Sequence, residues 1–310
     1  MVRVGYVGEK NCEIYGPGTP YYTLYKTLEQ TKYATRSGEV FYDMPSSNHD
    51  SKVLELAGKS DVLVYSSIHP TRHRPAESTL QLVRYRYKVP VVGTLWDSNL
   101  PEDSPANNFT MKVSDMVIPM GPNKEHPGMT LIPEAYDIET YFNDHRERDI
   151  DISYLGSLVP RRLDFIRSLQ NEGLDIFVSG DQRKSGLSQL EFTDLLRRSK
   201  ITINFPLRNE DILDSQARKG RPIEAALCGT VVAEEKTNLP ESVYYLRPDE
   251  EYIVLDKSDI KKSADIIREH LRDQDKLKRM SDTAYERVKE DCSPDTFWRE
   301  VLRRLGKLDE

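Results

Sequence analysis

The chain of 310 residues lacks the features that mark membrane-spanning and disulfide-linked proteins. No stretch approaches the roughly 18 consecutive apolar residues of a membrane span. The N-terminus, MVRVGYVGEK, has the pattern of a strand and not of a signal peptide. The three cysteines, Cys12, Cys228 and Cys292, are widely separated and form no CxxC pair. We therefore expect free thiols in a reducing cytoplasm.

Metal-ligand patterns are also missing. We identify no metal-binding Asp-x-Asp motif and no cluster of histidines at ligand spacing. It has no internal repeat and no low-complexity tract. We therefore expect neither a metal ion nor a bound cofactor. The net charge of −7 argues against a general nucleic-acid binder.

One stretch departs from this acidic balance. Between positions 72 and 88 five cations stand against a single acid, Glu77, and two tyrosines lie among them. The cations and tyrosines are Arg72, Arg74, Arg84, Tyr85, Arg86, Tyr87 and Lys88. A solvated helix face would account for the cluster, and a site for an anionic acceptor is the alternative.

Short apolar strands alternate with amphipathic helices, a pattern typical of α/β proteins with mainly parallel sheets. In the first half we expect strands at 2–8, 61–66, 89–94, 115–119 and 130–133, and helices at 20–30 and 77–87. In the second half we expect strands at 151–156, 175–180, 200–205, 230–235 and 253–256, and helices at 161–171, 188–198, 219–228, 258–271, 275–290 and 294–306. The length suits two domains, and the polar segment 141–149 predicts the linker between them.

Ligands of parallel sheets bind at the carboxyl ends of the strands, and a cleft between two such domains is the default site. The segment ARKGRPIEAALCGTVVAEE, residues 217–235, has the composition of such a site. Its cations Arg218, Lys219 and Arg221 stand where a helix begins, which favours a diphosphate. Glu224 follows inside the helix, where a carboxylate can bind the diol of a ribose. Alternatively, Glu224 complements the helix dipole and pairs with the nearby cations.

Several motifs in this order resemble group 1 glycosyltransferases, and the spore-maturation-type branch is the most similar. They are VPVVGTLWDSNL (89–100), TLIPEAYDIETYF (130–142), LGSLVPRR (155–162), SKITINFP (199–206) and KGRPIEAALCGTVVAEE (219–235). The resemblance implies the GT-B fold, in which two Rossmann-like domains enclose a cleft, with C-terminal helices. The domains would be 1–140 on the acceptor side and 150–290 on the donor side, and a C-terminal helix in 291–310 would pack back on the first domain.

The resemblance implies transfer of a sugar from a UDP- or GDP-sugar to an acceptor hydroxyl, with retention of configuration and without a metal. Arg162, Lys219 and Asp97 are the catalytic candidates. The donor-binding candidates are Gly16, Gly18, Ser157, Arg162, Gly180, Gln216, Lys219, Gly220, Arg221 and Glu224. The acceptor-binding candidates are His69, Arg72, His73 and Trp96. Plain turns would equally explain Gly16, Gly18 and Asp97.

Two positions depart from the family pattern. Many members carry a glutamate eight residues before the ribose-binding acid, where this chain has Gln216. Trp96 replaces the histidine of a His-Asp pair, and Asp97 remains. Three alternatives therefore stay open: a DNA-modifying glycosyltransferase acting on a hydroxylated base, a binding-only relative, and a nucleotide-sugar epimerase. The acceptor could be a glycan, a small molecule or modified DNA.

Overall fold

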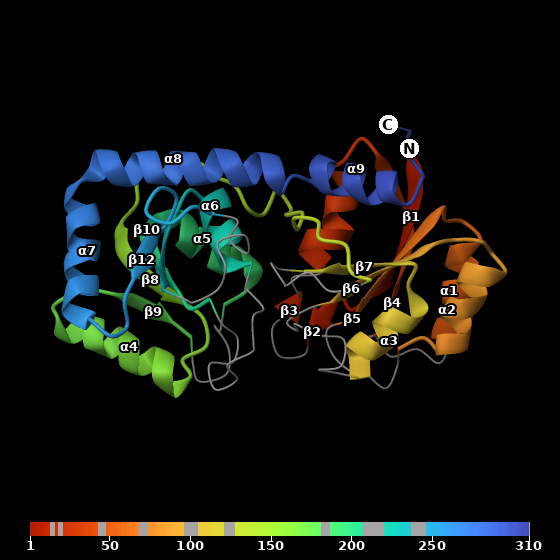
Figure 1. The fold of residues 1–310 in the computed structure, drawn as a ribbon, viewed down its shortest axis with the longest axis horizontal. Helices are drawn as coiled ribbons and strands as arrows, with labels where there is room; N and C mark the ends of the chain where they lie inside the picture. The colour runs from red at the N-terminus through yellow and green to blue at the C-terminus, as the bar shows by residue number, and fades with distance from the viewer. Residues whose placement is uncertain are drawn as a thin grey trace. The chain divides into compact units, whose positions relative to one another are not determined.

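The chain forms two compact units in the computed structural model (Figure 1). The structure describes residues 1–12, 16–17, 21–42, 48–67, 74–95, 105–120, 128–180, 187–206, 220–236 and 246–309. Met1–Ile138 and the chain end from Asp291 belong to the first unit. The described residues between Glu139 and Glu290 belong to the second unit.

The first unit is built on a parallel sheet with the strand order β4-β1-β5-β6-β7. Its strands are β1 (Val2–Gly8), β4 (Ala34–Phe41), β5 (Val62–Ser67), β6 (Val91–Leu95) and β7 (Met116–Pro119). Counted along the chain this is the order 2-1-3-4-5, one of the two common doubly wound arrangements. A separate antiparallel hairpin pairs β2 (Asn11–Cys12) with β3 (Gly16–Pro17).

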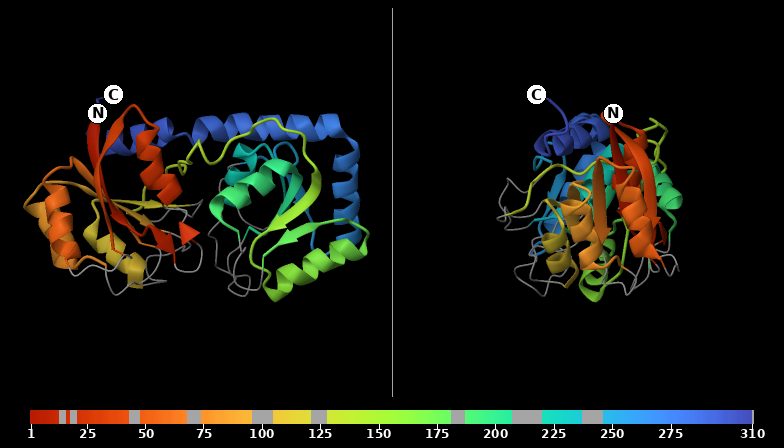
Figure 2. Two further views of the ribbon diagram at one scale, coloured as in Figure 1. Left: turned by 180° about the vertical axis from the view of Figure 1, so that it is seen from behind. Right: turned by 90° about the vertical axis from the view of Figure 1, so that its right-hand side faces the viewer.

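Both faces of this sheet are covered by apolar side chains. One face packs against α1 (His49–Ala57), α2 (Glu77–Tyr85) and α3 (Pro105–Val113). The other packs against α9 (Pro294–Arg304) and two tight turns, a π-helical turn at Tyr21–Tyr25 and a 3₁₀ turn at Lys26–Glu29. The two chain ends lie side by side here (Figure 2), because Val2, Leu305 and Leu308 pack against the same core cluster.

The second unit repeats this topology. Its parallel sheet has the order β12-β11-β10-β8-β9, which is again 2-1-3-4-5 counted from β8. The strands are β8 (Ile150–Leu155), β9 (Phe177–Ser179), β10 (Ser199–Asn204), β11 (Val231–Glu235) and β12 (Ile253–Leu255). One face packs against α4 (Pro160–Asn171), α7 (Ile260–Arg272) and α8 (Gln274–Asp291). The helix α5 (Gln189–Arg198) contacts β8 and β10, and the helix α6 (Arg221–Leu227) contacts β10 and β11.

The five predicted strands and six predicted helices of the second half are confirmed, with ends that differ by up to two residues. The first half was predicted less well. The expected strand at 130–133 is wrong: only an isolated bridge joins Met129 to Val117, and Pro133 has no N–H for a ladder. The expected helix at 20–30 is replaced by the π and 3₁₀ turns.

Five elements of the first unit were not predicted: the short hairpin strands β2 and β3, the strand β4, and the helices α1 and α3. The edge strand β4, ATRSGEVF, buries only Ala34 and Val40. An edge strand needs few apolar residues because one of its sides carries no neighbouring strand. The helix α1, HDSKVLELA, is short, and no side chain caps its first turn. The strand β4 thus lacks the alternation on which sequence prediction depends, whereas α1 buries His49, Val53, Leu56 and Ala57 at helical spacing over only nine residues.

We predict that α9 is essential to the stability of the first unit. Trp298 is fully buried, and its Nε1 donates a hydrogen bond of 3.1 Å to Thr27 Oγ1. Trp298→Ala should lower the free energy of unfolding by about 3–5 kcal/mol, because it leaves a large cavity. Arg299→Ala, on the exposed side of the same helix, is the matched control. Chemical denaturation followed by circular dichroism measures both, and equal midpoints for the two variants would contradict the prediction.

Candidate functional site

The candidate site lies at the carboxyl edge of the second sheet. In a doubly wound sheet, ligands bind where the strand order reverses, which here is between β8 and β10. Ser157 and Arg162 follow β8, and Phe205 follows β10. The topology therefore brings together two of the predicted donor-site residues at this edge.

Arg162 is held in the first turn of α4, which begins at Pro160. Its Nη1 donates a hydrogen bond of 3.0 Å to Ser157 Oγ, and its guanidinium lies over the Phe205 ring at 5.6 Å from the ring centroid. Tyr154 Oη in turn donates a bond of 2.6 Å to the Ser157 carbonyl. Arg162 is only 4% exposed. The switch point thus contains a buried cation that aromatic and hydroxyl groups hold in place.

The helix α6 is short because its sequence defines both ends. Pro222 occupies the first turn, where a missing N–H costs nothing. At the other end, Gly229 has φ of 71° and donates to the Ala226 carbonyl, while the Thr230 N–H donates to the Ala225 carbonyl. This Schellman pair satisfies the last carbonyls of the helix. The helix therefore ends in a tight turn at Gly229, and β11 begins two residues later.

Glu224 lies on the buried side of α6 and is 8% exposed. Tyr141 Oη donates a hydrogen bond of 3.1 Å to Glu224 Oε1. Gln189 Nε2, from the start of α5, donates a bond of 2.8 Å to Tyr141 Oη. Burial and the charge of Glu224 raise the pKa of Tyr141 well above its usual value. The phenol therefore stays protonated and remains a donor to the carboxylate.

Arg221 faces the other oxygen of this carboxylate. Its Nε lies 3.3 Å from Glu224 Oε2, and its guanidinium stacks 4.6 Å from the centroid of the Phe192 ring. Its Nη1 also donates to the carbonyl of Leu155, the last residue of β8. The ion pair agrees with the interpretation that Glu224 complements the helix dipole and pairs with a nearby cation. That interpretation does not account for the hydrogen bond from Tyr141, because pairing with a helix dipole requires no second donor.

Further polar pairs line the same edge of the sheet. Asn204 Nδ2 donates a bond of 2.7 Å to Glu234 Oε2, and both side chains are buried. Glu235 pairs with Arg161 and with Lys257, each at 2.7 Å. These residues were not among the predicted site residues, although the two acids at the end of the predicted strand TVVAEE were the available signal.

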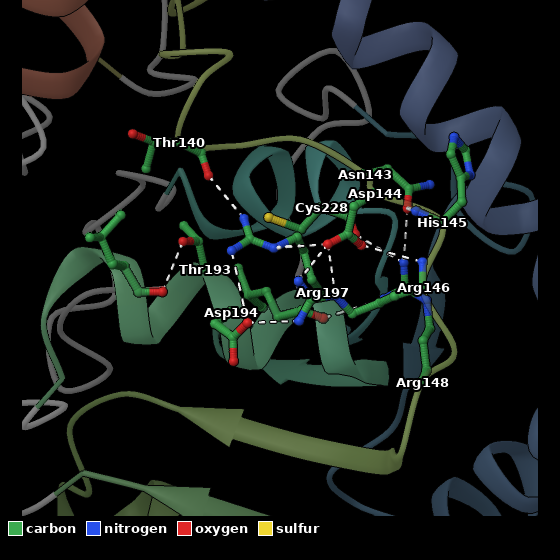
Figure 3. Close-up of polar contacts among 12 residues, drawn as sticks. Thr140, Asn143, Asp144, His145, Arg146, Arg148, Thr193, Asp194, Arg197 and Cys228 are labelled. Atoms are coloured by element: carbon green, nitrogen blue, oxygen red, sulfur yellow. Dashed lines mark hydrogen bonds and ion pairs between the residues drawn. The ribbon is translucent and has the colours of Figure 1, made fainter.

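The predicted linker, 141–149, belongs to the second unit and packs on it (Figure 3). Arg197 of α5 donates to the Thr140 carbonyl at 3.3 Å, and its Nε lies 3.6 Å from Asp144 Oδ2. Arg148 donates to the carbonyls of Leu196, Ser199 and Cys228 and to Thr230 Oγ1. Burial lowers the pKa of Arg148. The polar composition that suggested a solvated linker serves this packing instead.

The remaining predicted site residues are separated in the chain. Gly180 follows β9 and has φ of 138°, and Gly220 precedes α6. Gly16 belongs to the first unit, where it pairs with Cys12 in the antiparallel hairpin. The other predicted residues lie outside the part of the chain that the structure describes: Gly18, His69, Arg72, His73, Trp96, Asp97, Gln216 and Lys219. Their roles stay predictions.

The basic stretch 72–88 does not form a single helix face. Arg74 precedes α2 and stacks on Phe109, with its guanidinium 4.2 Å from the ring centroid. Arg84 lies in the last turn of α2 and pairs with Asp115 at 2.8 Å. The last four residues of the stretch, 85–88, are all exposed. They precede β6 and so lie at the amino edge of the first sheet, whereas Arg74 lies near the carboxyl edge.

Within the described ranges, no group of three or more His, Cys, Asp or Glu side chains is arranged to hold a metal ion. No helix in those ranges is long and apolar enough to cross a membrane.

Known proteins resemble this chain in two ways: a family model matches part of its sequence, and solved structures match its fold. Residues 161–303 match a family model described as glycosyl transferase-like. No curated protein sequence matches the chain. HepE from Anabaena, solved with UDP and glucose, is 13% identical with a TM-score of 0.65, and the match covers 99% of this chain and 100% of HepE.

Two structures of an alpha-glucosyltransferase are similar to the same extent. One contains UDP-glucose and DNA with an abasic site, and it is 14% identical with a TM-score of 0.66. The other contains UDP and a 13-mer DNA with a central A:G mismatch, and it is 15% identical with a TM-score of 0.67. Each match covers 99% of this chain and 100% of the other. The predicted GT-B class, two parallel-sheet α/β domains with a helical C-terminus, is confirmed.

The family match bears out the predicted resemblance to glycosyltransferases for the region 161–303. This region contains Arg162, Arg221 and Glu224. The assignment to the spore-maturation-type branch stays a prediction.

We predict that Cys228 is chemically inert in the folded protein. The residue is fully buried after α6, and burial raises the pKa of its thiol to about 12. The nucleophilic thiolate is therefore scarce at neutral pH. Burial also raises the pKa of Cys292 well above its usual value. In a Cys12→Ser background, a disulfide reagent that reports thiols by absorbance should react slowly before denaturation and with both thiols afterwards. Rapid reaction of the native protein would contradict this.

Proposed function

We propose that the protein is a glycosyltransferase that moves a sugar from a nucleotide-diphosphate sugar to an acceptor hydroxyl. The observation that supports this most strongly is that two buried charged side chains, one cationic and one acidic, lie at the carboxyl edge of the second sheet. Arg162 follows β8 at the switch point, and Glu224 lies on α6. A diphosphate needs the first charge, and a ribose diol needs the second. The family match covers both residues.

The donor is proposed to be a UDP-sugar. The structural neighbours contain UDP or UDP-glucose, which favours UDP over GDP for a chain of the same fold. Glu224 would accept hydrogen bonds from the ribose hydroxyls. Three further donor-binding candidates lie in turns where backbone groups can approach the diphosphate. Ser157 follows β8, Gly180 follows β9, and Gly220 precedes α6.

The chemistry follows from the growth of charge on the leaving group. As the bond from the anomeric carbon to the diphosphate breaks, negative charge accumulates on the phosphate oxygens. Arg162 is preorganised by Ser157 and Phe205, so that little reorganisation is needed when this charge appears. Lys219 would add a second cation. With these cations in place, we propose a reaction that needs no divalent metal.

Retention of anomeric configuration is proposed from the resemblance to group 1 glycosyltransferases alone. No residue is assigned as a nucleophile. Asp97 is proposed to contact the transferred sugar or to orient the acceptor hydroxyl, and Gln216 to bind a sugar hydroxyl as a neutral amide. His69, Arg72, His73 and Trp96 are proposed for the acceptor.

We predict that UDP and UDP-glucose raise the melting temperature of the protein, because a ligand of the native state stabilises it. Glu224→Gln should weaken UDP binding by roughly 10- to 100-fold, since a hydrogen bond to a charged group contributes about 1.5–3 kcal/mol. Arg162→Ala should weaken binding of the diphosphate and lower turnover. Thermal shift with a panel of nucleoside diphosphates and their sugars, followed by calorimetry, measures these effects.

The control is Glu172→Gln, an exposed acid of the second unit outside the carboxyl edge. It should bind UDP as the wild type does. Wild-type affinity in both the Glu224→Gln and Arg162→Ala variants would refute the donor site. Release of free UDP from UDP-glucose without an acceptor separates the transferase from a binding-only relative, which would bind UDP and not release it. Interconversion of the sugar while it stays attached to UDP would indicate an epimerase.

A hydroxylated base in DNA is the second candidate acceptor. It is favoured by the alpha-glucosyltransferase neighbours, whose structures contain DNA. Phosphate contacts would make binding to a duplex weaken steeply with salt. We predict that affinity for a 13-mer duplex falls at least tenfold between 50 and 200 mM salt, as measured by fluorescence anisotropy, if DNA is the acceptor. Undetectable binding at about 50 mM salt would leave a glycan or small-molecule acceptor.

A further inference from the structure

The two oxygens of the Glu224 carboxylate have different surroundings. Oε1 accepts a hydrogen bond from Tyr141, and Oε2 faces Arg221 Nε at 3.3 Å. A carboxylate accepts hydrogen bonds through about four lone-pair positions, so these contacts leave acceptor capacity for a ligand. They also determine the plane of the carboxylate. The direction in which Glu224 can accept a further hydrogen bond is therefore set by its protein partners.

Tyr141 is itself fixed from two sides. Its ring is buried, and its Oη accepts from Gln189 Nε2 at 2.8 Å while donating to Glu224. Gln189 is the first residue of α5, and the capping box of Ser188 and Glu191 sets its position. The chain Gln189–Tyr141–Glu224 thus runs from the start of α5 to α6. Tyr141 donates rather than loses its proton, because its pKa is raised.

Arg197 contacts the residues on both sides of Tyr141 in the chain, the Thr140 carbonyl and the Phe142 ring. It donates to the Thr140 carbonyl at 3.3 Å and lies over the Phe142 ring at 4.5 Å from the centroid. It also pairs with Asp144 at 3.6 Å. One buried guanidinium therefore contacts the residues immediately before and after Tyr141. This arrangement leaves the phenol little freedom to move away from Glu224.

We propose that Tyr141 is a positioning residue for nucleotide recognition. It holds Glu224 Oε1 so that the carboxylate presents a fixed edge to one ribose hydroxyl, and the site thereby discriminates ribose from deoxyribose. The proposal rests on the proposed function, in which Glu224 binds the ribose. Arg197 contributes one step further away, because it fixes the segment that carries Tyr141.

A conservative substitution separates the role of the Tyr141 hydroxyl from the contribution of its ring to folding. Tyr141→Phe removes the hydroxyl and keeps the buried ring, so Glu224 loses one donor and gains freedom to rotate. The deoxyribose analogue that lacks this hydroxyl makes one hydrogen bond fewer to Glu224, so its binding depends less on that rotation. Tyr141→Phe should therefore lower the affinity for UDP more than the affinity for this analogue. A purely structural role for Tyr141 would weaken both ligands equally.

The test is calorimetric titration with UDP, 2′-deoxy-UDP and 3′-deoxy-UDP on the full chain. The wild type should prefer UDP over at least one deoxy analogue. Tyr141→Phe should reduce that preference by about 5- to 10-fold, and Gln189→Met should reduce it in the same direction by a smaller factor. Arg198→Ala is the matched control, because this neighbour of Arg197 pairs with Asp149 at the surface. It should keep the wild-type preference.

The outcomes distinguish this proposal from the proposed function. An unchanged preference in Tyr141→Phe, or an equal loss for all three ligands, overturns the positioning role while UDP binding by the wild type still supports the donor site. UDP binding without any ribose preference in the wild type also overturns it. A wild type that binds none of the ligands overturns both. If Tyr141→Phe does not fold, as judged by circular dichroism, Gln189→Met decides, and its wild-type preference would overturn the proposal.

Discussion

The burial of the Glu224 carboxylate is the constraint on which the candidate site depends. A buried charge is tolerated only with hydrogen-bonding or charged partners, and here these come from three parts of the second unit. Tyr141 precedes β8, Arg221 begins α6, and Arg221 is in turn bonded to the carbonyl of Leu155 at the end of β8. Satisfying one acid therefore ties the end of a central strand, a short helix and the segment before the sheet to one another.

The strand order explains why these groups meet. In the order 2-1-3-4-5 the connections from β8 and β10 leave in opposite directions, and the gap between them at the carboxyl edge is available for a ligand. Arg162 lies on one side of that gap, beside Phe205 from β10. The positions of Arg162 and Glu224, for which we propose a phosphate and a ribose as ligands, are thus a consequence of topology and burial.

Much of the second unit was predictable from the sequence, and part of the site was not. Its strands are apolar runs bounded by turns, and its helices show clear amphipathic periodicity, so the carboxyl-edge residues Ser157, Arg162 and Glu224 followed from local pattern and resemblance. Tyr141 and Gln189 did not, because Tyr141 is 83 positions from Glu224 and 48 from Gln189, and no local period reports such contacts. The polar composition of 141–149 suggested a linker. An arginine that is buried and bonded to carbonyls cannot be distinguished by sequence from one that is exposed to solvent.

The central claim is that a nucleotide sugar binds at the carboxyl edge of the second sheet. Hydrogen–deuterium exchange of the full chain with and without saturating UDP tests it most directly, because it reports the location of binding along the backbone. We predict slower exchange in peptides that cover residues 153–162 and 220–230, with little change in α1 and α2 of the first unit. Unchanged exchange in both of those peptides under saturating UDP would contradict the claim.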